Sequence, residues 1–262
     1  MICPKCKYEQ PQAGLECVKC GIVFEKYLAR KKLLSENQRT PNPAQVKGVD
    51  DDELAATSIG YFIKALFLHV KPSINPFYFA GRMIFFLIIL IWGLKFIFAP
   101  MDSNYFWQSF LHPVNLVFHE AGHVLFRPLG HFMTMLGGSL AQLLMPLVCF
   151  LVLLIKTRDT FGASVALWWL GQSFMDLAPY INDARARKLM LLGGVTGRDV
   201  PDYHDWEFIL RKLGWLKWDH VLGNMAQGTG ILLMVVTFGW GGYLLWKQYK
   251  NLDTGVSSTN SD

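Results

Sequence analysis

Long apolar runs separated by short polar segments dominate the chain after residue 82. A run of about 20 residues with few charges is long enough to cross the hydrocarbon core of a bilayer as a helix. Five crossings are predicted, over 83–99, 113–127, 139–156, 161–181 and 221–246. Alternation from one crossing to the next places the N-terminus inside the cell and the C-terminus outside. Residues 129–138 are punctuated by glycines and predict a turn. A re-entrant segment over 129–146 is the alternative, and it would change the number of crossings.

Polar and amphipathic segments lie on both sides of these runs. Residues 57–82 mix aromatic and basic positions and are interrupted by Pro72 and Pro76, which favours an amphipathic segment at the membrane interface. The predicted organisation is a small domain over 1–28, a helix tail and polar linker over 29–56, the interfacial segment over 57–82, a transmembrane domain over 83–250 and a polar tail over 251–262.

Composition supports a membrane protein. Of the 262 residues, 52% are hydrophobic and only 17% are charged, which is too apolar for an ordinary soluble domain. The formal net charge of +5 does not require nucleic acid, because basic residues gather outside the apolar runs, as they do in cytoplasmic loops. By this rule, Arg82 and the basic loop Ala184–Lys188 are both expected in the cytosol. The predicted fold class is an all-α polytopic protein of the inner or plasma membrane.

Four of the five cysteines form two CxxC pairs, Cys3 with Cys6 and Cys17 with Cys20. This spacing is typical of a tetrahedral Cys₄ structural zinc site in a reducing compartment, and CVKCGIVF resembles the second knuckle of zinc ribbons. No apolar secretory signal opens the chain, so we expect a cytoplasmic N-terminus. The small N-terminal zinc ribbon would bind a protein partner or the cytosolic part of a substrate, or act only as a folded cap. No nucleic-acid partner is expected.

Polar side chains with metal-binding chemistry interrupt the apolar run NLVFHEAGHVLFR. His119 and His123 are four residues apart, so on a helix they share one face and can offer nitrogens to one ion. The HExxH spacing is that of zinc hydrolases, in which the metal lowers the pKa of bound water and the adjacent glutamate, here Glu120, takes the proton. Burying these groups among apolar neighbours costs several kcal/mol unless a metal offsets it. The run therefore predicts a catalytic Zn²⁺ site.

A catalytic zinc needs a third protein ligand, and three residues compete for that role. They are Asp176, Asp183 and His204, of which His204 lies in a polar loop and fits a structural turn better. Gln142 and Asn182 are polar groups that could line the same site.

A membrane-embedded HExxH helix followed two spans later by MDLAPYINDAR resembles the site-2 protease family of intramembrane metalloproteases. In that family the later motif is Asn, Pro and then LDG, whose Asp completes the metal site. The resemblance places Pro179 on the family proline, Asp176 on the Asn and Asp183 on the ligand Asp, although this chain has NDA where the family has LDG. It implies Asp183 as the third ligand, with Asp176 as second choice.

The resemblance implies a zinc-dependent intramembrane endopeptidase with one catalytic and one structural Zn²⁺. Its substrate would be a membrane protein in the lipid bilayer, and Glu120 would be the general base. Two other functions use the same polar residues. One is a non-catalytic membrane adaptor, and the other is a zinc-binding membrane sensor or transporter.

Overall fold

The computed structural model describes residues 2–5, 8, 9, 17, 20, 22–28 and 60–252. The chain folds as two compact units, residues 1–59 and 60–262. The described part is mostly helical, and its only β-type pairings are isolated bridges. This agrees with the all-α fold class expected from the sequence.

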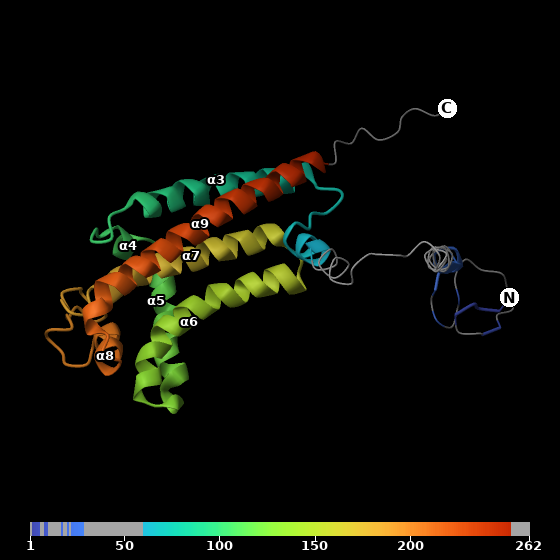
Figure 1. Cartoon of the computed structure of the whole chain (residues 1–262). Coiled ribbons are helices and arrows are strands. Elements are labelled where there is room, and N and C mark those ends of the chain that lie inside the picture. The colour runs from blue at the N-terminus through green and yellow to red at the C-terminus, as the bar shows by residue number, and fades with distance from the viewer. Residues whose placement is uncertain are drawn as a thin grey trace, which may run out of the picture. The chain divides into compact units, whose positions relative to one another are not determined.

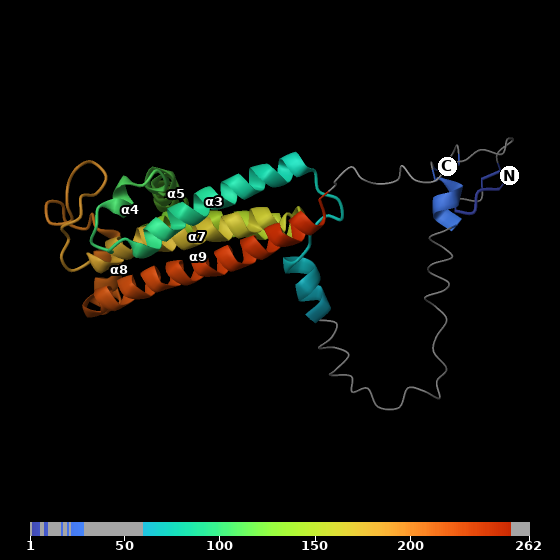
Figure 2. The same ribbon diagram turned by 90° about the horizontal axis from the view of Figure 1, so that it is seen from above.

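Four long helices of the second unit run along one another. They are α3 (Pro76–Phe98), α6 (His131–Leu151) with its π-helical extension η2 (Val152–Lys156), α7 (Thr160–Asn182) and α9 (Asp219–Lys250). Figures 1 and 2 both show α3, α7 and α9 side by side. Three stretches are long and apolar enough to cross a membrane, namely Pro76–Phe98, His131–Lys156 and Leu216–Lys250. The described helices thus provide three such stretches, compared with the five crossings that the sequence predicts.

Helix α7 is the most enclosed of the four. Most of its side chains are buried, including Trp168 and Met175, which belong to the main apolar core. A Cβ at Gly230 of α9 would lie 2.5 Å from the carbonyl oxygen of Gly171, so the two backbones touch there because neither residue has a side chain. Neighbouring helices therefore surround α7, and its polar side chains face protein.

The HEAGH residues lie on α5 (Leu111–Phe126), a helix of 16 residues that follows the short α4 (Tyr105–Gln108). At 1.5 Å per residue α5 is about 24 Å long, less than the thickness of a hydrocarbon core. It packs against the first half of α6, where a Cβ at Gly122 would lie 2.2 Å from the oxygen of Gly137. The turn predicted over 129–138 is wrong for most of its length, because α6 begins at His131 and Gly137 lies within that helix.

The segments that enter and leave this unit lie at the same end of the bundle. The Ile74 amide donates to the Asn251 carbonyl over 2.9 Å, and Ile74 forms a parallel bridge with Leu252. The sequence predicted that the chain enters and leaves on opposite sides of the membrane; in the bundle, the two connections lie side by side. Arg82 pairs with Asp159 at the start of α7 over 2.7 Å, whereas the basic loop 184–188 follows the other end of that helix. Arg82 and this loop, both expected in the cytosol, thus lie at opposite ends of α7.

The expected interfacial segment over 57–82 is divided. Residues 60–67 form a separate helix, but α3 begins at Pro76, with the Asn75 side chain accepting from the Phe77 amide over 2.9 Å. Proline at a first helical position and an Asn N-cap both favour a helix start. The first long helix thus begins at Pro76, seven residues before the predicted start at Met83.

A loop and the short helix α8 (Asp205–Lys212) connect α7 with α9 through η3 (Leu216–Trp218). The N-cap of α8 is His204, whose Nδ1 accepts from the Glu207 amide over 3.2 Å. Phe208, Ile209 and Leu210 are buried and hold α8 against the bundle. This packing fixes the first residue of α8 beside α5.

Candidate metal centre

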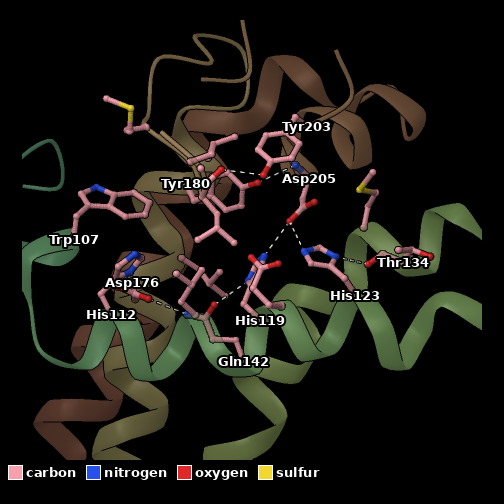
Figure 3. Close-up of a pocket in the computed structure, with 18 of the residues that line it drawn as sticks. Trp107, His112, His119, His123, Thr134, Gln142, Asp176, Tyr180, Tyr203 and Asp205 are labelled. Carbon is pink, nitrogen blue, oxygen red and sulfur yellow. Dashed lines mark hydrogen bonds and ion pairs between the residues drawn. The ribbon is translucent and has the colours of Figure 1, made fainter. Parts of the chain in front are cut away.

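Two imidazoles on α5 and one carboxylate on α8 converge at a single point. His119 Nε2 lies 2.9 Å from Asp205 Oδ2, and His123 Nε2 lies 3.2 Å from the same oxygen. The ligand atoms of these three residues all lie within 4.8 Å of one another. Figure 3 shows the two rings on adjacent turns of α5 with the Asp205 carboxylate between them.

The far nitrogens of both imidazoles are held by groups that can only accept a hydrogen bond. His123 Nδ1 lies 2.8 Å from the Thr134 carbonyl oxygen, and His119 Nδ1 lies 3.0 Å from Gln142 Oε1. Each Nδ1 is therefore the donor, and in the neutral ring each Nε2 presents a lone pair. Two lone pairs then face a carboxylate oxygen.

The convergence of these three electron-rich atoms requires positive charge between them, from protons on both rings or from a metal ion. Nitrogen and oxygen ligands about 2.0–2.1 Å from a tetrahedral zinc lie about 3.4 Å apart, close to the separations found here. Burial alone would raise the pKa of Asp205, but its hydrogen bonds with His119 and His123 outweigh burial and hold that pKa below its ordinary value. The two nitrogens and the carboxylate oxygen fit a metal ion by their chemistry and spacing.

Helix α6 approaches this centre through a residue without a side chain. A Cβ at Gly138 would lie 2.6 Å from His119 Nε2 and 2.7 Å from His123 Nε2. Any other residue would occupy the space beside the ligand nitrogens. The backbone of α6 at Gly138 therefore forms one wall of the site.

Glu120 lines the same cavity as the three converging residues. The cavity has a volume of about 490 Å³. No hydrogen bond or ion pair links the Glu120 carboxylate to another residue in the described part of the chain. A carboxylate left in this state beside a metal site can take a proton from water.

Asp176 supports the centre without touching it. It is buried and accepts from His112 Nδ1 over 3.0 Å, from Asn115 Nδ2 over 3.2 Å and from Gln142 Nε2 over 3.0 Å. Because a carboxylate only accepts, it fixes which end of the Gln142 amide faces His119. The order Asp176, Gln142, His119 thereby sets the imidazole tautomer, and Figure 3 shows these side chains in sequence.

The structure keeps Asp183 and Asn182 away from the two imidazoles. Asp183 is the C-cap of α7 and accepts from the amides of Lys188 and Leu189 over 3.1 and 2.9 Å. Burial opposes its ionisation, but hydrogen bonds from His204 and from these amides lower its pKa overall. Asn182 Oδ1 lies 2.6 Å from His220 Nδ1. Among the described residues, Asp205 and not the predicted ligand Asp183 meets the two imidazoles. Sequence reasoning did not consider Asp205 as a ligand.

Three of the four N-terminal cysteines form a second cluster, in the other unit. Cys3, Cys17 and Cys20 have sulfurs within 4.8 Å of one another, and Cys3 Sγ lies 3.7 Å from Cys20 Sγ. Thiolates about 2.3 Å from a tetrahedral zinc lie about 3.8 Å apart. The amide of Cys3 donates to the Tyr8 carbonyl and that of Cys17 to the Ile22 carbonyl, both over 2.9 Å. The two turns are thus closed in the same way; Cys6 lies outside the described residues.

Comparisons with protein-family models, with curated proteins and with solved structures find no match for this chain.

Proposed function

We propose that this protein is a zinc-dependent endopeptidase of site-2 protease type that cleaves membrane proteins within or beside the bilayer. His119, His123 and Asp205 would hold the catalytic zinc. The chain would be a multi-pass protein of the inner or plasma membrane with its N-terminus in the cytoplasm. Three helices long and apolar enough to span support the membrane part of this proposal.

The observation that carries the proposal is a three-residue group that fits a metal ion, with the Glu120 carboxylate in the same cavity and unpaired among the described residues. Three protein ligands with one open position distinguish catalytic zinc sites from closed structural ones. A metal held only for storage or structure has no use for Glu120. Bound zinc would supply the Lewis acidity that polarises a peptide carbonyl and makes water nucleophilic at neutral pH.

The side chains of this chain have separate roles in the proposed reaction. Glu120 takes a proton from the attacking water and delivers it to the leaving amine. Asp205 balances part of the positive charge of the site. Asp176 acts through Gln142 to hold His119 in the tautomer that presents Nε2, which is a positioning role.

The walls of the cavity favour an apolar substrate segment. Besides the polar groups already described, it is lined by side chains with apolar surfaces, namely Trp107, Leu116, Met135, Leu177, Met190, Leu191 and Leu192. An unwound stretch of a transmembrane helix presents apolar side chains together with accessible peptide bonds. We therefore propose such segments as substrates.

The N-terminal unit is proposed to be a Cys₄ zinc ribbon formed by Cys3, Cys6, Cys17 and Cys20. The sulfur separation and the two equivalent turns support this proposal. Such a small unit has little apolar core, so zinc would supply most of its stability. A protein partner would bind through this ribbon.

The substitution Glu120→Gln tests the proposed function. In lipid reconstitutions with candidate membrane substrates, we expect cleavage to fall by at least about 100-fold, since a general base contributes roughly 10²–10⁴. The zinc content should stay at that of the parent protein, because Glu120 is not a ligand. Asp202→Asn is a matched control, since this carboxylate is exposed at the edge of the cavity and should leave cleavage unchanged.

Unchanged cleavage by the Glu120→Gln protein would sink the mechanism. A parent protein that cleaves no membrane substrate but binds partners through the ribbon would instead be an adaptor. Zinc flux into proteoliposomes that survives in Glu120→Gln would identify a transporter.

A further inference from the structure

A second cavity lies at the end of the bundle opposite the metal centre. Its volume is about 700 Å³. The segment 69–75 and the first residues of α3 form one wall, and residues 157–159 between η2 and α7, with Thr160 at the start of α7, form another. Gln248, near the end of α9, also lines it.

Side chains give this cavity a positive charge. Lys71, Arg82 and Arg158 line it, against a single carboxylate, Asp159. Asp159 is already paired with Arg82 over 2.7 Å and also caps α7 by accepting from the Gly162 amide. Lys71 and Arg158 form no ion pair with any described residue. Helices α3 and α7 begin near this cavity, whereas the helix 60–67, η2 and α9 end near it. The helix dipoles therefore supply no net positive potential, which comes from the two cations without an ion pair.

The backbone of Arg158 supports a role for its side chain. Its φ is +55°, in the left-handed region. An L-residue other than glycine is disfavoured there. A glycine would fit without this penalty, but it would not bring a guanidinium to the cavity.

A buried polar atom points independently to a ligand. Gln248 is only 1% exposed, and its Oε1 has no hydrogen-bond partner among the residues that the structure describes. A buried acceptor without a donor is unfavourable and needs an explanation. A ligand that carries a hydroxyl group would supply the missing donor.

The surroundings of the cavity indicate where this ligand comes from. Phe77 and Tyr78 at the start of α3 are 90% and 54% exposed. Both stand at the end of a helix long and apolar enough to span, which is where aromatic rings mark the interface between bilayer and water. The cavity thus opens where phospholipid headgroups lie.

We propose that this cavity binds the headgroup of an anionic phospholipid of the phosphatidylglycerol class. Lys71 and Arg158 hold the phosphate, and a headgroup hydroxyl donates to Gln248. Basic pockets between membrane helices are a recognised form of lipid binding site. The proposal does not depend on proteolysis.

Native mass spectrometry of the full-length protein in detergent tests this site. The protein is titrated with phosphatidylglycerol, phosphatidylcholine, phosphatidic acid or inorganic phosphate. We expect phosphatidylglycerol to bind most tightly, and Lys71→Ala and Arg158→Ala each to weaken it about fivefold. Lys71→Arg keeps the positive charge and should bind phosphatidylglycerol as tightly as the parent protein does. The control Lys212→Ala, an exposed cation at the other end of the bundle, should have no effect.

The substitution Gln248→Met distinguishes the contribution of the headgroup hydroxyl to binding from that of the phosphate. It should weaken phosphatidylglycerol and leave phosphatidic acid unchanged, because phosphatidic acid has no headgroup hydroxyl. The variants should keep the melting temperature and zinc content of the parent. The proposal is overturned by equal affinity for phosphatidylcholine, by an equal effect of Lys212→Ala, or by inorganic phosphate displacing the lipid at equal concentration.

Discussion

At the scale of single residues, three aspartates differ in what their oxygens already bind. Asp183 accepts from two backbone amides of its own loop, and Asp176 accepts from three side chains. Asp205 Oδ2 instead lies between two imidazole nitrogens. A carboxylate has about four acceptor sites. Asp183 and Asp176 use several of these sites on donors away from the two imidazoles, whereas Asp205 faces the imidazoles.

Zinc content should separate the three aspartates. The parent protein is expected to hold two zinc ions, and Asp205→Ala should lose one of them while the ribbon keeps the other. Asp183→Ala and Asp176→Ala should each keep two ions at saturating zinc. Asp176→Ala should also lose about 1–3 kcal/mol of stability, since it leaves buried donors unpaired.

Metal analysis of purified protein, with circular dichroism to confirm the fold, gives these values. Loss of an ion with Asp183→Ala alone would restore the ligand that the sequence favoured. A double change of Cys3 and Cys17 to serine provides the complementary control and should remove only the ribbon ion.

At the scale of elements, the helix that carries HEAGH and the apolar runs could be predicted from periodicity and length. The i, i+4 spacing also predicted that His119 and His123 share a face, as they do. The meeting of Asp205 with these imidazoles could not be predicted in this way, because Asp205 is 86 residues away from His119 along the chain. The approach of α8 to α5 depends on the burial of Phe208, Ile209 and Leu210, which no local motif encodes. The family pattern instead drew the choice to Asp183, which lies at a helix end and serves as its cap.

Helix α6 should prove intolerant of a side chain at Gly138. Gly138→Ala places a Cβ against both ligand nitrogens, so at least one ring must turn away. We expect loss of the catalytic zinc and of cleavage. The helix itself should not be weakened, since alanine favours helix by about 1 kcal/mol over glycine.

The matched control is Gly228→Ala in α9, where nothing lies within 4 Å of the added Cβ. It should keep both zinc ions and unfold at the same or a slightly higher temperature. If Gly138→Ala retained two ions and full cleavage, the close approach of α6 to the metal centre would be contradicted.

At the scale of the whole molecule, the metal centre and the basic cavity lie at opposite ends of α7. That helix has 23 residues and is about 35 Å long, close to the thickness of a bilayer core. Composition predicted long apolar helices, and three of the described helices are long and apolar enough to span a membrane. The count of five crossings included α5, which has 16 residues and pairs with α6.

The meeting of Ile74 with Leu252 predicts a labelling pattern. With a membrane-impermeant maleimide, Pro72→Cys and Lys250→Cys should react from the same side of the membrane, and Lys212→Cys from the other. Intact and permeabilised cells are compared, and the labelling of the parent protein is subtracted. Reaction of Pro72→Cys and Lys250→Cys from opposite sides would exclude the bundle described above.

The glycine beside the ligand nitrogens also bears on which ions the centre can accept. A wall made of backbone cannot retreat by changing rotamer, so the space between His119, His123 and Asp205 is as fixed as α6 itself. Calcium requires six to eight oxygen ligands at 2.3–2.6 Å, and this rigid, nitrogen-rich corner offers neither the number nor the radius. The backbone wall at Gly138 would thus help the centre to discriminate against calcium, because this wall keeps the space for the ion small.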